Sequence, residues 1–127
     1  MKKLFVIIFL LSGYFANAQF TAEQIKATLP GKNWSIVKYE MFGVADEPKP
    51  EQVNDKIVLN ADMSFVIVEK GIEYKGKWSI MNPSVYINCK ASNWTKMYKI
   101  ISLGETESVI QFKDPDLIKT DYYLVAK

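Results

Sequence analysis

Apolar and polar side chains alternate along most of the chain after residue 29. Between Ile72 and Ile80 the apolar side chains and one glycine occupy every second position, and charged or polar side chains lie between them. Successive side chains of a strand point to opposite faces, so this period of two predicts a strand with one face toward a core. Eight such segments are bounded by turn-forming residues. They span 34–42, 56–60, 64–69, 72–80, 85–89, 95–103, 108–113 and 120–126.

A short helix is predicted before the first strand. Thr21 and Gln24 have the spacing of a capping box, and Pro30 with Gly31 ends the segment. Ile25 and Leu29, four residues apart, share one face of this helix, and we expect that face to brace the sheet.

Short connectors between the predicted strands favour antiparallel neighbours, because a parallel crossover needs about a dozen residues or more. Eight strands in a meander can remove their edges by closing on themselves. We therefore predict an all-β fold: an eight-stranded antiparallel up-and-down barrel with a short N-terminal helix. A two-sheet sandwich is the structural alternative. The polar segment 43–55 carries Pro48 and Pro50 and is predicted to be a loop.

In the first predicted strand, regular alternation would place charged residues on the inward face. Trp34 and Ile36 share their face with Lys38 and Glu40 if the alternation is regular. Either these charges lie at the open end of the barrel, where they can contact a ligand head group or simply be solvated, or a β-bulge changes the register.

Residues 1–18 have the three parts of a secretory signal peptide. Lys2 and Lys3 precede an apolar run over 4–11, and Ala16-Asn17-Ala18 precedes Gln19. The run is shorter than the roughly 20 residues that span a bilayer. We expect export to the periplasm or beyond the cell, a mature chain that does not span the membrane, and one domain over 19–127.

Composition narrows the chemistry. Removing Lys2 and Lys3 leaves 14 basic residues (16 − 2) against 14 acidic ones, so nothing favours nucleic-acid binding. The chain has no histidine, which excludes Ser-His-Asp and Cys-His catalysis and the common imidazole zinc sites. Cys89 is interpreted as a buried, inert thiol, and Asp114 with Asp116 as turn residues. We expect no enzymatic activity, no metal and no cofactor.

Three short motifs resemble those of the small bacterial lipocalin-like, calycin-type secreted proteins. Gly31-Lys32-Asn33-Trp34 resembles the Gly-x-Trp motif of the first strand in that family, "NADMSFVI" resembles its turn and third strand, and Gly76-Lys77-Trp78 resembles a second Gly-x-Trp. The resemblance implies a barrel that holds a small hydrophobic or amphipathic ligand in its lumen.

Period-two alternation selects the side chains that would face such a lumen. Two interpretations of this set stay open, a ligand cavity and a filled core. A filled barrel would suit an accessory protein that docks on an envelope protein partner. The candidate ligand-binding residues are Trp34, Ile36, Phe65, Ile67, Tyr74, Trp78, Ile80, Ile87, Tyr122 and Leu124.

Overall fold

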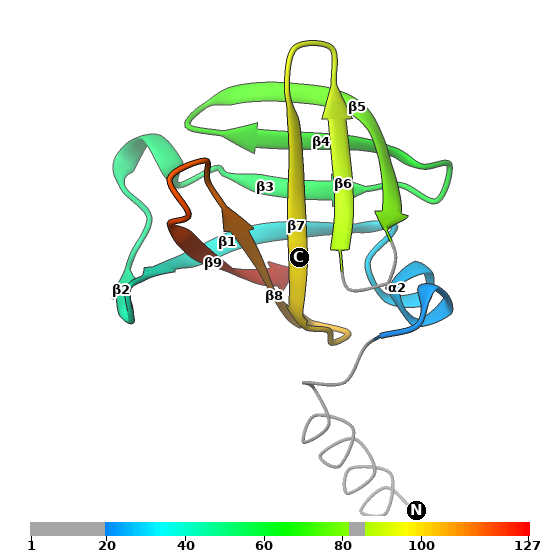
Figure 1. Ribbon diagram of the computed structural model, residues 1–127, viewed down its shortest axis with the longest axis horizontal. Helices are drawn as coiled ribbons and strands as arrows, with labels where there is room; N and C mark the ends of the chain where they lie inside the picture. Colours follow the sequence, from blue (N-terminus) through cyan, green and yellow to red (C-terminus); the bar gives the residue numbers. More distant parts are fainter. Residues whose placement is uncertain (1–19, 82–85) are drawn as a thin grey trace, which may run out of the picture.

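The computed structural model describes residues 20–81 and 86–127 (Figure 1). Three predicted features lie outside the described residues: the signal peptide, the turn that follows Met81, and Val85 at the start of the fifth predicted strand. Within these residues the chain forms one short α-helix, one 3₁₀ turn and nine strands. The elements are α2 (Ala22–Thr28), β1 (Lys32–Met41), β2 (Val44–Asp46), η1 (Pro50–Gln52), β3 (Lys56–Leu59), β4 (Ser64–Glu69), β5 (Ile72–Met81), β6 (Tyr86–Ala91), β7 (Thr95–Ser102), β8 (Glu107–Lys113) and β9 (Lys119–Ala126).

Eight of the nine strands close into an antiparallel barrel. From β3 to β9 each strand pairs with the next along the chain, and β1 pairs with both β3 and β9. The short β2 pairs only with the second half of β1 and stands outside this ring. The predicted up-and-down barrel with a short helix is therefore confirmed, and the sandwich alternative is wrong.

Two tight hairpins follow from local backbone chemistry. Phe42 and Gly43 join β1 to β2, and Lys70 and Gly71 join β4 to β5, each pair with positive φ at both positions. Positive φ at both central residues defines the type I′ turn, whose twist matches that of the flanking strands. The turn predicted at Lys70-Gly71 is confirmed. The predicted loop 43–55 instead begins with β2, and η1 starts at Pro50.

A β-bulge in β1 explains why the charged residues of the first strand do not face inward. The pairing of β1 with β9 shifts between Ile36 and Lys38, so Tyr39 rather than Lys38 continues the inward face. Lys38 instead lies over the ring of Tyr123, 4.0 Å from its centroid, and the Tyr123 hydroxyl donates to Glu40 at 3.2 Å. Of the two sequence interpretations, the bulge is the one the structure contains.

Helix α2 closes one end of the barrel. Thr21 caps it, and both hydrogen bonds of the predicted capping box are present. Ile25 and Leu29 are buried in the same core cluster as the inward side chains of the strands. Figure 1 shows α2 and β2 at opposite ends of the molecule.

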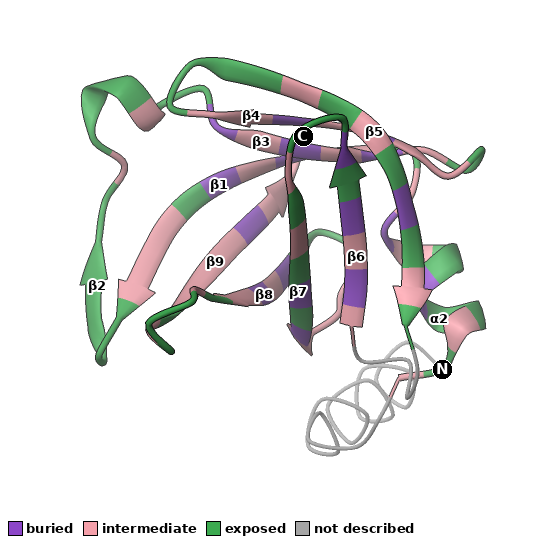
Figure 2. Cartoon of the chain, turned by 45° about the horizontal axis from the view of Figure 1, so that its top comes forward, coloured by how far each residue is buried: buried purple, intermediate pink, exposed green. Residues whose placement is uncertain are grey.

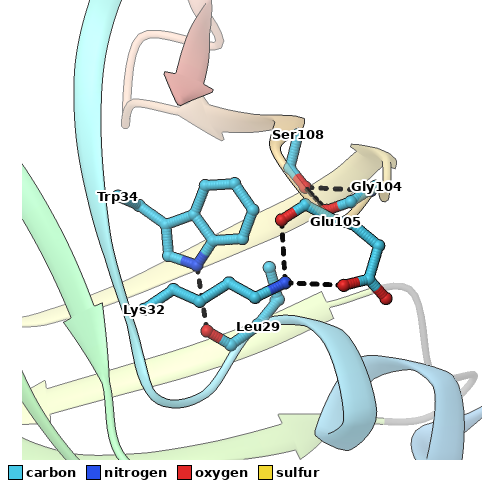
Figure 3. A network of polar contacts seen from close by, with 6 residues as sticks. All are labelled: Leu29, Lys32, Trp34, Gly104, Glu105 and Ser108. Carbon is cyan, nitrogen blue, oxygen red and sulfur yellow. Dashed lines mark hydrogen bonds and ion pairs between the residues drawn. The ribbon is translucent and has the colours of Figure 1, made fainter. Parts of the chain in front are cut away.

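The closed end is tied together by polar contacts around Trp34 (Figure 3). The Trp34 indole N–H donates to the carbonyl of Leu29 at 2.9 Å, which fixes the end of α2 against the first strand. Lys32 reaches across to the β7–β8 connection and donates to the backbone carbonyl of Glu105 at 2.8 Å. The N–H of Gly104 donates to the Ser108 hydroxyl at 3.1 Å, which holds the same connection.

The lumen beyond this end is packed with side chains. Buried and less buried residues alternate along β6 and β7, as Figure 2 shows. The largest fully buried side chains include Trp34, Trp78, Tyr98 and Phe65. Four bulky aromatic residues of this kind fill much of an eight-stranded lumen, which at that size has room only for side chains or one small ligand.

Candidate ligand-binding site

The barrel has an open end opposite α2. The connections 42–55, 70–71, 92–94 and 114–118 all lie there, because antiparallel strands place alternate connections at the same end. A cavity of about 260 Å³ enters the lumen beneath the 42–55 connection. We call it the open-end cavity.

The open-end cavity has an apolar floor and a polar rim. Ile36, Ile57 and Ile67 come from neighbouring strands and form the floor, and all three are buried. Three tyrosines, Tyr39, Tyr98 and Tyr122, also line it. The full set of lining residues is Ile36, Tyr39, Met41, Asp46, Glu47, Lys49, Gln52, Asp55, Ile57, Ile67, Val68, Glu69, Lys70, Tyr98, Thr120 and Tyr122.

Asp55 anchors the wall of this cavity. Its side chain accepts a hydrogen bond from the Tyr39 hydroxyl at 2.7 Å and another from the Lys70 backbone N–H at 2.8 Å. The backbone carbonyl of Asp55 accepts a hydrogen bond from the backbone N–H of Ile36 at 3.1 Å. Asp55 is only 2% exposed, and a buried carboxylate is tolerated when it is hydrogen-bonded in this way. These bonds hold the 42–55 connection to β1 and to the β4–β5 turn.

Three tyrosines share the cavity and are in ring contact. The Tyr39 and Tyr122 rings meet edge to face with centroids 5.4 Å apart, and Tyr98 lies 6.0 Å from Tyr122. Burial raises the pKa of Tyr39 above its ordinary value, and the hydrogen bond to Asp55 raises it further. Burial likewise raises the pKa of Tyr98 and of Tyr122. All three are therefore neutral hydroxyl groups at physiological pH.

The other side of the open end is occupied by side chains. The Trp94 ring stacks on Phe65 at 5.9 Å and packs against Tyr74 at 5.0 Å. Lys96 lies over the Trp94 ring and donates to Glu69, with its Nζ 2.8 Å from Oε1. Phe65, Tyr74, Trp94 and Lys96 do not line the open-end cavity, whereas Glu69 does.

The predicted site residues divide into two groups. Ile36, Ile67 and Tyr122 line the open-end cavity. The other seven lie elsewhere: Tyr74 and Ile80 are half-buried against the core, and Trp34, Phe65, Trp78, Ile87 and Leu124 are buried within it. These seven do not line the open-end cavity.

Most of the lining residues, 13 of 16 (16 − 3), were not among the candidates selected from the sequence. Four of these shape the cavity most directly: Tyr39, Asp55, Ile57 and Tyr98. Ile57 and Tyr98 do follow the period of two along β3 and β7, so alternation alone gives their orientation. Tyr39 faces inward only because of the bulge. Asp55 ends a polar connection, where no periodicity indicates its burial.

The structure bears out two interpretations of single residues. The Asp114 side chain accepts from the backbone N–H groups of Asp116 and Ile118 at 2.8 and 3.0 Å, which is turn chemistry. Cys89 is fully buried, and burial raises the pKa of its thiol to about 12. Such a thiol stays protonated and unreactive.

Over residues 20–81 and 86–127, no three His, Cys, Asp or Glu side chains are grouped to hold a metal ion. No helix in the described part of the chain has the length and apolar character to cross a membrane. Comparison with protein-family models, with curated proteins and with solved structures gives no match.

Proposed function

We propose that this chain is an exported, lipocalin-like protein that binds a small apolar or amphipathic molecule without acting on it chemically. The observation that carries the proposal is the open-end cavity, with three isoleucines on its floor and polar groups at its rim. Ligand pockets combine an apolar lining with a few placed polar groups in this way.

The size of the cavity limits the ligand. Its 260 Å³ is slightly below the pockets of about 300–1,000 Å³ that take drug-sized ligands. A single ring or a short alkyl chain with one polar group matches this volume. A long-chain fatty acid exceeds this volume, and in the described part of the chain buried aromatic residues such as Trp34 and Trp78 occupy the lumen toward α2.

The proposal is tested by filling the cavity. Ile67→Phe adds ring volume on the inward face of β4, and we expect it to weaken binding of a short-chain alcohol such as 1-hexanol at least tenfold in isothermal titration calorimetry. Val66→Phe is the matched control, since it adds the same ring one position away on the opposite face. We expect the control to bind within twofold of the wild type.

A stable, folded Ile67→Phe variant that binds the alcohol as the wild type does would contradict a site in the open-end cavity. Ile57→Phe on the neighbouring strand β3 provides a second filling of the same space if Ile67→Phe does not fold.

The second candidate function is docking on an envelope protein partner, and one observation favours it. Several apolar side chains of the open-end connections are exposed, among them Phe42 at 79% and Leu117 at 71%. Large exposed apolar groups that cluster mark interaction sites. Native mass spectrometry of protein purified from its own cells separates the two functions: a co-purifying small molecule supports the cavity, and a stoichiometric protein partner with no small molecule supports docking.

A further inference from the structure

The open-end cavity carries an excess of negative charge. Its lining includes four carboxylates, Asp46, Glu47, Asp55 and Glu69, against two ammonium groups, Lys49 and Lys70. Glu69 is paired with Lys96, and the excess remains when that pair is set aside. Three carboxylates then face two ammonium groups, a net excess of one negative charge (3 − 2), and a local excess of one sign favours ions of the opposite sign.

The charges also differ in depth. Asp55 is buried, whereas Asp46 and Glu47, like Lys49 and Lys70, are exposed. Long lysine side chains keep their ammonium groups in water, while a buried carboxylate keeps its field within the cavity. The deepest fixed charge is therefore negative.

A second and independent observation points to a polar ligand group in the same cavity. Tyr98 is 1% exposed and lines the cavity, yet its hydroxyl forms no hydrogen bond with any described residue. In the described part of the chain, every fully enclosed side-chain nitrogen or oxygen has a hydrogen-bond partner. The Tyr98 hydroxyl has none, so it is not fully enclosed and borders the cavity that Tyr98 lines. A buried hydroxyl without a protein partner costs free energy unless something in the cavity bonds to it.

Asp55 and Tyr98 can both accept a hydrogen bond from a ligand in the cavity. Asp55 uses one bond at each carboxylate oxygen, and a carboxylate has about four acceptor sites in all. The hydroxyl of Tyr98 can also accept, and the faces of tyrosine rings attract cations. A carboxylate head group would instead lie beside the buried charge of Asp55, which is unfavourable.

Resting on the proposed function, we infer that the ligand of the open-end cavity is a small organic cation: a primary or methylated ammonium group on a short apolar body. The ammonium group lies near Asp55 and Tyr98, and the apolar body rests on the isoleucine floor.

Three probes with the same chain length test this inference: hexylammonium, 1-hexanol and hexanoate, titrated at pH 7 and low salt by isothermal calorimetry. We expect hexylammonium to bind at least tenfold more tightly than 1-hexanol, and hexanoate to bind most weakly. Raising the salt concentration is expected to reduce the preference for hexylammonium, since screening weakens charge interactions near the surface.

Two variants assign the preference to named groups. Tyr98→Phe removes only the hydroxyl, and we expect it to weaken hexylammonium binding about fivefold while 1-hexanol binding changes less. Tyr123→Phe, which removes a hydroxyl from the outer face of β9, is the matched control and should change neither. Asp55→Asn is expected to abolish the preference for the cation over the alcohol. Tyr98→Phe remains informative if Asp55→Asn does not fold.

The outcomes separate the inference from the function beneath it. If 1-hexanol or hexanoate binds saturably and at least as tightly as hexylammonium, the inference of a cationic ligand is wrong. The proposal that the open-end cavity binds a small molecule would still stand. Failure of all three probes to bind would overturn the proposed function itself.

Discussion

At the scale of single residues, Trp78 shows how completely the lumen is packed toward its closed end. Its side chain is 2% exposed, and its indole N–H donates to the carbonyl of Asn60 at 3.0 Å. It is thus both a large apolar group in the core and a link between β5 and the β3–β4 turn.

We expect Trp78→Ala to lower the free energy of unfolding by about 3–5 kcal/mol, because it removes a buried aromatic group and leaves a cavity. Urea denaturation monitored by circular dichroism measures this loss. A change close to zero would mean that Trp78 does not lie in the core.

The tyrosines of the cavity make stability depend on alkaline pH. In the unfolded chain they ionise near pH 10, whereas burial raises the pKa of Tyr39, Tyr98 and Tyr122 in the folded protein. The folded state therefore retains protons that the unfolded state releases. This contribution to stability is fully present below about pH 10 and is lost as pH rises toward the folded-state pKa values.

We expect the free energy of unfolding to fall between pH 9 and pH 11 in urea denaturation. Cys89 adds to the same trend, since burial raises its pKa to about 12. Tyr39→Phe should show a shallower decline than Tyr123→Phe, whose hydroxyl lies on the outer face. Stability that stays level or increases over this range would contradict the burial of these groups.

At the scale of elements, strand β5 depends on the absence of a side chain at Gly76. A Cβ atom placed there would collide with the backbone carbonyl of Lys90 on β6 and lie 2.8 Å from Cε2 of Phe65 on β4. The Phe65 ring therefore packs against the glycine backbone, which explains the Gly-x-Trp motif in local terms: the glycine makes room for one aromatic residue, and Trp78 supplies another.

We expect Gly76→Ala to destabilise the barrel by about 1–3 kcal/mol, as overpacking does. Ser79→Ala on the exposed face of the same strand is the control, and we expect it to stay within about 0.5 kcal/mol of the wild type. Thermal and urea denaturation of both variants measure the difference. Equal stability of the two variants would show that β4 and β6 lie farther from Gly76 than the structure places them.

The elements themselves were largely readable from the sequence. Alternation located every barrel strand to within two residues at each end, and Thr21 with Gln24 located the helix. The β1–β2 hairpin was missed because Pro48 and Pro50 dominate the composition of its connection, although the pairing of β2 ends at Asp46, before either proline.

At the scale of the whole molecule, the site was harder to predict than the fold. The open-end cavity exists because β1 pairs with β9 and because Asp55 fixes a long connection to the barrel. Neither contact has a signature in local alternation. The volume of the lumen that stays open depends on which parts of it the aromatic side chains occupy. Trp34 and Trp78 fill the closed end, and Trp94 fills one side of the open end.

The measurement that tests the central claim most directly is a ligand titration followed by the δ1-methyl NMR signals of the isoleucines. Ile36, Ile57 and Ile67 form the cavity floor, whereas Ile25 on α2 and Ile87 on β6 are buried away from it. With hexylammonium as the probe, we expect saturable shifts in the first three signals and little change in the other two. Shifts that are absent or unsaturable, or that concentrate on Ile25 and Ile87, would contradict a binding site at the open end of the barrel.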